Sequence, residues 1–186
     1  MKWLRVGVIG VLGLVAMMLP QAASAEERSC RGTLGAITVD NLRVPQGATC
    51  TLRGTRVKGT ITVKRGATLL ASRVRVVGNV QAENAKNVLV NGASQVGGSI
   101  QIKQGGGATV RGTRVKGDIQ YDHNRKRLRA ENNRVVGSIQ VVGNKGGAVI
   151  AGNVVNGNLD CKENRPAPTG GGNRVGGSKT DQCESL

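Results

Sequence analysis

Arginine recurs along this sequence at intervals of 19 or 20 residues, or at multiples of that interval. The recurring positions are Arg56, Arg75, Gln95, Arg114, Arg134, Val154 and Arg174, so five of seven hold arginine. The guanidinium fork binds phosphate and carboxylate groups through paired hydrogen bonds. If each interval is one coil of a stacked repeat, neighbouring positions lie about 4.8 Å apart. The spacing therefore predicts a row of arginines, and one hypothesis is that the row binds an anionic polymer of the cell envelope or matrix. The alternative is a solvated edge, whose arginine stems only cover apolar turns.

The four cysteines are the second set of residues with informative spacing. Cys30 and Cys50 are 20 residues apart, and Cys161 and Cys183 are 22 apart. Four cysteines allow three pairings, but residues one coil apart in a stack have the Cα separation that a disulfide tolerates. We therefore expect disulfides Cys30–Cys50 and Cys161–Cys183. A metal site would use closer cysteines together with histidine, and the only histidine is His123. We expect neither a metal nor a cofactor.

Residues suited to catalysis are sparse. Asp118, Asp122 and Asp160 are the acids that could share one sheet face, and His123 follows Asp122 in a turn. A polysaccharide lyase or hydrolase needs clustered carboxylates, and no nucleophile motif or phosphate-binding glycine loop is present. We expect no enzymatic activity and assign no catalytic residue. A polysaccharide-active enzyme is the lesser alternative.

The elements that position these residues follow from one motif, Val-x-Gly-polar-aliphatic, as in Val135-Val136-Gly137-Ser138-Ile139. Its glycines stand at 59, 78, 98, 117, 137, 157 and 177, and such a period indicates stacked repeats. Apolar and polar residues alternate after each glycine, and again in a shorter stretch such as Val88-Leu89-Val90. This alternation predicts two strands per coil, with a short third side near a Thr/Asn corner.

Successive coils repeat one path, so their strands are parallel, and parallel crossovers are overwhelmingly right-handed. One coil cannot bury its apolar face alone, whereas a stack makes one continuous core. The sequence thus predicts an all-β, single-domain, right-handed parallel β-helix over residues 26–186, with about eight coils of 19–20 residues. In this register Ile100, Ile119 and Ile139 form one buried column.

Two polar columns accompany the arginine positions. Small side chains directly precede them at Thr55, Val74, Ser94, Thr113, Asn133, Asn153 and Asn173. A second column lies three positions after the motif glycine, at Thr62, Gln81, Gln101, Gln120, Gln140 and Asp160. Such side chains hydrogen-bond to one another along a stack, so we interpret both columns as structural. The glutamine column also makes a flat polar face that could hold a ligand or another subunit.

Both ends of the stack are expected to be closed. The last copy of the motif has Lys179 where a buried Ile or Leu is expected. The Pro166–Gly172 run is expected to replace the second strand of its coil, since proline cannot donate to a strand ladder. With the two disulfides holding the terminal coils, the chain should not grow filaments by coil stacking.

The repeat unit Val-x-Gly-x-Ile-x-Val resembles that of bactofilins, which are polymer-forming right-handed β-helices, and that of small exported β-helix proteins. The resemblance covers most of residues 39–177. It implies the β-helix fold and, as an alternative function, a scaffold that self-assembles end to end or through the glutamine face.

Residues 1–25 have the features of a secretory signal peptide: a basic start, an apolar stretch over Val6–Leu19 and the cleavage signal Ala23-Ser24-Ala25. The apolar stretch is short for a membrane span. We expect cleavage near Ala25, a mature chain with no membrane span, and a secreted, periplasmic or cell-surface location.

Charge and aromatic content narrow the range of partners. The formal net charge is +16, which favours polyanionic partners. Trp3 and Tyr121 are the only aromatic residues, so stacking on bases or sugars has little support. We do not expect specific nucleic-acid recognition, and composition leaves the oligomeric state open.

Overall fold

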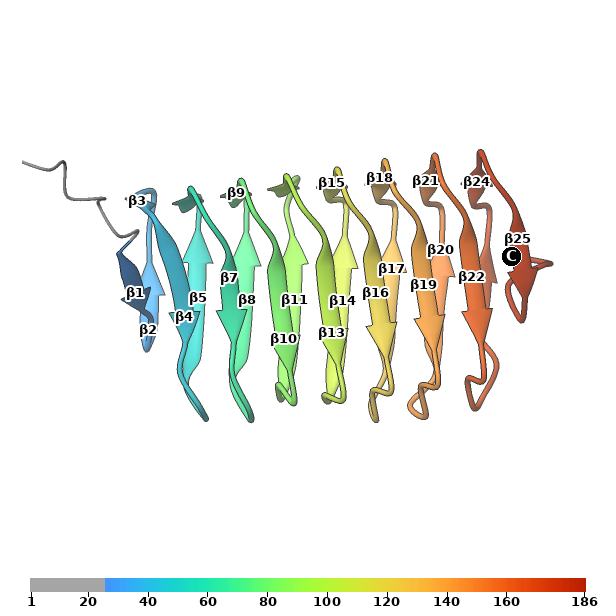
Figure 1. The fold of residues 1–186 in the computed structure, drawn as a ribbon, viewed down its shortest axis with the longest axis horizontal. Coiled ribbons are helices and arrows are strands. Elements are labelled where there is room, and N and C mark those ends of the chain that lie inside the picture. The colour runs from blue at the N-terminus through green and yellow to red at the C-terminus, as the bar shows by residue number, and fades with distance from the viewer. Residues whose placement is uncertain (1–25) are drawn as a thin grey trace, which may run out of the picture.

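The computed structural model describes residues 26–186 and contains 25 β-strands and no helix over that range. The strands form three parallel sheets, one of nine strands and two of eight, and each full coil contributes one strand to each sheet (Figure 1). The predicted all-β solenoid of about eight coils is confirmed. The predicted signal peptide, residues 1–25, lies outside the described residues.

Sheet A forms the near face in Figure 1, and sheet B forms the paler face behind it. The strands of sheet A are β1 (Glu27–Ser29), β4 (Asn41–Val44), β7 (Ile61–Val63), β10 (Val80–Glu83), β13 (Ile100–Lys103), β16 (Ile119–Asp122), β19 (Ile139–Val142), β22 (Leu159–Lys162) and β25 (Lys179–Asp181). Those of sheet B are β2 (Gly32–Leu34), β5 (Thr49–Arg53), β8 (Thr68–Ser72), β11 (Asn87–Asn91), β14 (Gly107–Arg111), β17 (Leu128–Glu131), β20 (Ala148–Ala151) and β23 (Thr169–Gly171).

Sheet C is the short third side, which runs along the upper edge of Figure 1. Its strands have two residues each: β3 (Thr38–Val39), β6 (Arg56–Val57), β9 (Arg75–Val76), β12 (Gln95–Val96), β15 (Arg114–Val115), β18 (Arg134–Val135), β21 (Val154–Val155) and β24 (Arg174–Val175). The near strands run downward and the far strands upward while the chain advances from left to right (Figure 1). This winding is right-handed, as predicted.

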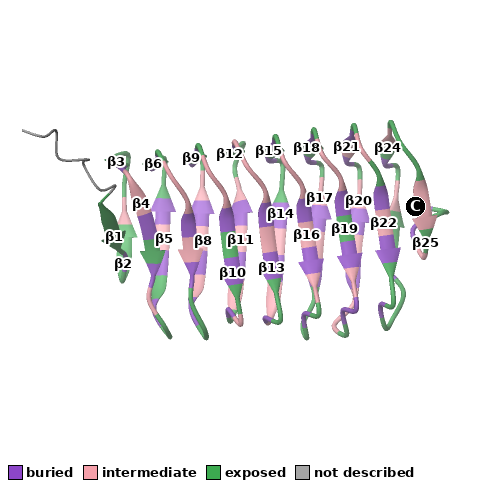
Figure 2. Cartoon of the chain, in the orientation of Figure 1, coloured by how far each residue is buried: buried purple, intermediate pink, exposed green. Residues whose placement is uncertain are grey.

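The core is a stack of aliphatic side chains from all three sheets. Inward and outward residues alternate along the long strands (Figure 2), as the period of two requires. Ile119 lies in register between Ile100 and Ile139, and all three side chains are fully buried, which confirms the predicted column. Tyr121 lies in the same core; its hydroxyl donates to the Arg129 carbonyl oxygen at 2.7 Å, and burial raises the pKa of the phenol.

The motif glycines are explained by a hydrogen-bond ladder that runs the length of the stack. The polar residue after a motif glycine, or Asn41 at the equivalent position of the first coil, accepts a hydrogen bond from the backbone N–H of the equivalent residue one coil later; seven such bonds measure 2.8–3.2 Å. The accepting side chain lies over the next glycine. A Cβ at Gly137 would be 2.2 Å from Asp118 Oδ1 and 2.8 Å from the Gly117 carbonyl oxygen, so only glycine leaves room for the ladder.

Both predicted disulfides are present, with Cα–Cα separations of 5.5 Å for Cys30–Cys50 and 5.2 Å for Cys161–Cys183. The assumption that each pair occupies equivalent positions in successive coils is wrong. The register partner of Cys50 is Gly32, and that of Cys161 is Asp181. Cys183 reaches the core because the chain turns back after β25.

Three residues, Lys179, Cys183 and Leu186, close the C-terminal end of the stack. Lys179 is the register partner of Leu159 and is half-buried, so the apolar column ends there, as predicted. Cys183 and Leu186 are buried over the end of the core. One correction concerns the Pro166–Gly172 run: it does not replace the second strand entirely, because Thr169–Gly171 still forms β23 beside β20.

Reduction of the disulfides is expected to loosen both ends before the middle. The bridges close separations of 20 and 22 residues, and each stabilises the fold by about 3 kcal/mol in the chain-entropy account. Amide exchange should accelerate first in the strands nearest the ends, β1, β2 and β25. Electron microscopy and sedimentation of the oxidised protein should show no fibres. Regular fibres in the oxidised protein, with coils continuous between molecules, would contradict the closed ends.

Candidate functional site

Sheet C positions the arginine row, which we define as Arg56, Arg75, Arg114, Arg134 and Arg174. Each of these arginines is the first residue of its two-residue strand, and all five are exposed. The seven positions are register partners in succession. Arg56 pairs with Arg75 and Arg114 with Arg134, whereas Gln95 and Val154 take the place of arginine in two of the coils. The seven positions from 56 to 174 span roughly 30 Å at one strand spacing per coil.

The residues on either side of each arginine fix its outward direction. In the coil of Arg134, Asn133 is 2% exposed and Val135 is 0% exposed, so the arginine between them must point outward. Asn133 donates from Nδ2 to the Val110 carbonyl at 2.8 Å and to Asn153 Oδ1 at 3.0 Å. The asparagine part of the predicted structural column, Asn133, Asn153 and Asn173, is thus a buried ladder, here called the corner ladder, and it makes the backbone beneath Arg134 and Arg174 rigid.

The charges of the row are not neutralised within the described part of the chain. Ion pairs there involve other basic residues, such as Lys58 with Asp40 and Arg129 with Glu131, each at 3.0 Å. Beside Arg114 and Arg134 the corner between sheets B and C is hollowed by a groove of about 390 Å³. An elongated anion lying along the row could therefore contact guanidinium groups and the groove together.

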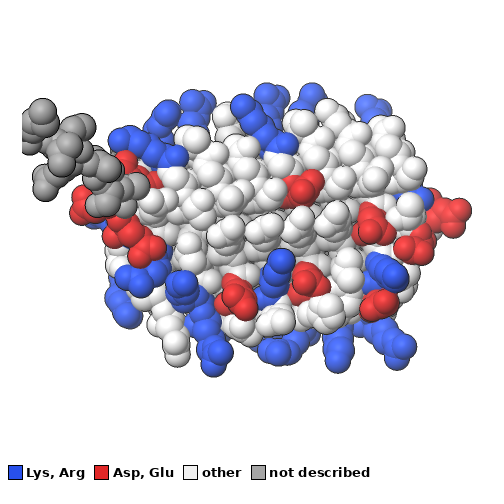
Figure 3. Space-filling model, in the orientation of Figure 1, with Lys and Arg blue, Asp and Glu red and all other residues white. Residues whose placement is uncertain are grey.

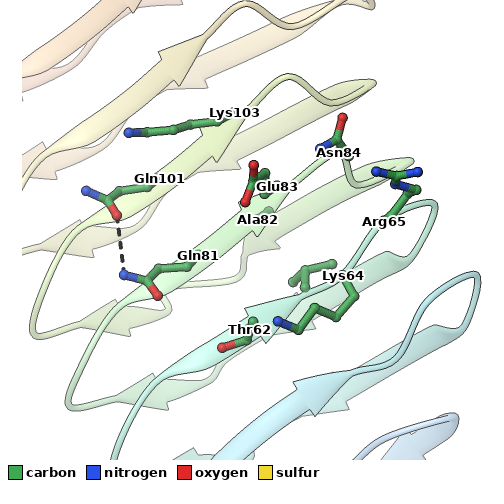
Figure 4. A pocket seen from close by; sticks show the side chains of 10 residues that line it. Thr62, Lys64, Arg65, Gln81, Ala82, Glu83, Asn84, Gln101 and Lys103 are labelled. Carbon is green, nitrogen blue, oxygen red and sulfur yellow. Dashed lines mark hydrogen bonds between the residues drawn. The ribbon is translucent and has the colours of Figure 1, made fainter.

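The outer face of sheet A is polar, as the glutamine column predicted. Gln81 Nε2 donates to Gln101 Oε1 at 3.4 Å, and Gln101 Nε2 donates to Gln120 Oε1 at 3.0 Å. Within residues 26–186 no hydrogen bond joins Gln120 to Gln140, so the ladder is partial. A shallow hollow of about 480 Å³ lies beside it, with Thr62, Lys64, Gln81, Glu83, Gln101 and Lys103 among its lining residues (Figure 4).

The three acids considered for catalysis are not brought together. Asp118 accepts the Ser138 N–H at 2.8 Å, Asp160 accepts the Thr180 hydroxyl at 2.7 Å, and Asp122 is hydrogen-bonded to the His123 ring. Each thus has its own structural partner. Over residues 26–186 no three side chains of His, Cys, Asp or Glu are grouped as metal ligands would be. No helix in that range is long and apolar enough to cross a bilayer.

Sequence reasoning missed a second buried ladder and the basic residues that follow it. Asn124, Asn144 and Asn164 are 0–3% exposed in the turns between sheets A and B. Asn124 Nδ2 donates to Asn144 Oδ1, Asn144 Nδ2 donates to Asn164 Oδ1, and Gln182 Oε1 accepts from Asn164 to end the series. We call this the turn ladder. Its 20-residue spacing was the available signal.

Comparisons of the chain with protein-family models, curated proteins and solved structures found no match.

Proposed function

We propose that the protein is a structural protein without enzymatic activity, exported to an oxidising compartment, that binds an anionic polymer of the cell envelope or matrix along the arginine row. The main support is the row itself: five exposed arginines in register, without carboxylate partners in the described chain. The two disulfides support the location, because such bonds persist in extracellular or periplasmic surroundings.

The alternative of a merely solvated edge differs from this proposal in its energetics. Like charges held about 4.8 Å apart repel one another. Side chains on a mobile loop could spread apart, but pairing within sheet C holds the backbones of the row in a fixed register, and the corner ladder adds to this beneath Arg134 and Arg174. A bound polyanion relieves the repulsion at every coil and releases its own counterions, so affinity should depend strongly on salt. Guanidinium forks also suit carboxylate and phosphate geometry.

Replacing Arg56, Arg75, Arg114 and Arg134 together with Gln is expected to weaken binding to polygalacturonate and to flatten its salt dependence. On DNA each neutralised phosphate contributes about 0.9 to the slope of log K against log salt, so loss of four contacts should reduce the slope by as much as about 3.6. Isothermal titration at several salt concentrations measures both quantities. The polymer should keep its chain length during incubation with either protein.

A matched control removes the same charge elsewhere. Arg28, Arg31, Lys103 and Lys162 are exposed and lie outside the row, so their joint replacement with Gln should leave affinity and slope closer to those of the unaltered protein. Equal effects of the two quadruple variants would show that net charge alone drives binding and that the row is a solvated edge. Shortening of the polymer would instead favour the polysaccharide-active alternative.

A bactofilin-like, self-assembling scaffold is the second candidate. The feature that favours it is the flat glutamine face, where Gln81, Gln101 and Gln120 already hydrogen-bond in series. Assembly through this face would leave the coil ends free, whereas end-to-end growth is opposed by Lys179 and by the Cys161–Cys183 cap. Lateral assembly would appear in sedimentation as oligomers that persist at high salt, because uncharged contacts are not screened.

A further inference from the structure

A second basic row follows the turn ladder. Lys86, Arg125, Lys145 and Arg165 are exposed and occupy successive coils apart from one interruption at Gly106. Backbone hydrogen bonds from Gly106 to Ala85, from Arg125 to Gly105, from Lys145 to Asn124 and from Arg165 to Asn144 place them one above another. We call this set the turn row. Lys126 and Arg127 are exposed beside it. Over the described chain no ion pair involves any of these six residues.

The two rows are built in the same way. In the arginine row, buried Asn133 and Asn173 directly precede Arg134 and Arg174. In the turn row the same order recurs: Asn124 precedes Arg125, Asn144 precedes Lys145 and Asn164 precedes Arg165. The buried amides hydrogen-bond along the stack, as Asn124 does to Asn144 and Asn133 to Asn153, and this fixes the turn, so the basic side chain that follows must point outward. Both rows are therefore rigid and parallel to the long axis of the solenoid.

The rows lie on opposite edges of the molecule. Sheet C runs along the upper edge, and the turns between sheets A and B form the lower edge (Figure 1). Lys and Arg side chains gather at both edges, whereas the face between them is largely uncharged and carries scattered acids with a few basic side chains among them (Figure 3). Those acids on sheet A include Glu83, Asp122 and Asp160. Lys103 lies in register between Glu83 and Asp122, so this face has no continuous row of basic side chains to lead a polyanion from one edge to the other.

We propose that the protein holds two polyanion chains at once, one on each edge, and so cross-links them. This inference rests on the proposed function for the arginine row and adds a second site of the same chemistry. The partner at each edge is a linear polymer of carboxylate or phosphate groups. A protein that binds two such chains would cross-link them into a network rather than coat single polymer chains.

Short oligogalacturonates that carry either a donor or an acceptor fluorophore test the cross-link. The intact protein should bind two oligomers and bring donor and acceptor together in one complex. The arginine-row variant described above and a turn-row variant, with Lys86, Arg125, Lys145 and Arg165 replaced by Gln, each lose four charges. Each should bind one oligomer and give no energy transfer. The control variant at Arg28, Arg31, Lys103 and Lys162 should bind two and retain it.

The outcomes separate the two proposals. Failure of the intact protein to bind any oligomer would overturn the function of the arginine row as well. Binding of one oligomer that is lost in the arginine-row variant would leave that function standing and overturn the cross-link. Energy transfer that persists in the turn-row variant would also overturn the cross-link. The donor and acceptor would then be brought together by association of two protein molecules, each with one occupied site. A parallel series with short polyphosphate chains shows whether carboxylate or phosphate is the preferred group.

Discussion

Ile119→Asp is expected to prevent folding. The Ile119 side chain is fully buried between Ile100 and Ile139 in the middle of the stack. An aspartate there has only aliphatic neighbours in its column, and an unpaired buried charge costs several kcal/mol even after relaxation. Loss of the isoleucine packing adds about 2 kcal/mol or more. The sum approaches the whole stability of an ordinary domain, so circular dichroism should show no cooperative unfolding transition.

Two matched variants separate burial from other effects. Ile119→Val keeps the column apolar and should cost about 1 kcal/mol. Gln120→Asp places the same new carboxylate one residue away, on the outer face of sheet A, and should leave the transition nearly unchanged. Normal thermal stability of Ile119→Asp would mean that the register of the stack is wrong at this coil.

The register of the long strands could be predicted because it depends on one periodic feature. Each Val-x-Gly motif requires its glycine, because a polar side chain of the preceding coil occupies the space that a Cβ would need. Asp118 occupies this space at Gly137. The glycine therefore marks the same point in every coil, and alternation from that point assigns inward and outward residues. The outward direction of the arginine row follows directly, since each arginine lies three positions before a motif glycine.

The turns and ends could not be predicted in the same way, because there the chain departs from the period. The turn ladder begins only at Asn124, and the two preceding coils hold Ala85 and Gly105 near that position. Three asparagines in turns of unequal length are too short a series to predict a ladder from the sequence. At the ends, Cys30 follows β1 and Cys183 lies beyond β25, so neither obeys the register of its partner. The predicted pairs are still correct, because Cys30 lies two residues before the register partner of Cys50 and Cys183 lies two residues after that of Cys161.

Asn144→Leu is expected to lower the free energy of unfolding by about 3 kcal/mol or more, since each buried polar group left unpaired costs 1–3 kcal/mol. Asn144 Oδ1 accepts from the backbone N–H of Asn124 at 2.8 Å and from its Nδ2 at 3.0 Å, and Asn144 Nδ2 donates to the Tyr121 carbonyl oxygen at 2.9 Å. Leucine, which is similar in size, removes all three bonds: the backbone N–H of Asn124 and the Tyr121 carbonyl oxygen lose these side-chain partners, while Asn124 Nδ2 keeps its bond to the Ile102 carbonyl oxygen. Denaturant titration measures the loss.

The place in the chain where protection from exchange is lost distinguishes loss of the turn-ladder hydrogen bonds from a general packing defect. Asn156→Leu, at an exposed position directly after β21, serves as the control and should leave stability within about 0.5 kcal/mol. In Asn144→Leu, amide exchange should accelerate first at Asn124 and at Arg125, because their turn depends on the lost bonds. The basic residues of the turn row belong to the same turns, so an oligomer should bind the turn row more weakly, whereas the affinity of the arginine row for its oligomer should not change. Unchanged stability in Asn144→Leu would show that water replaces the amide, and that the turn row does not depend on the ladder beneath it.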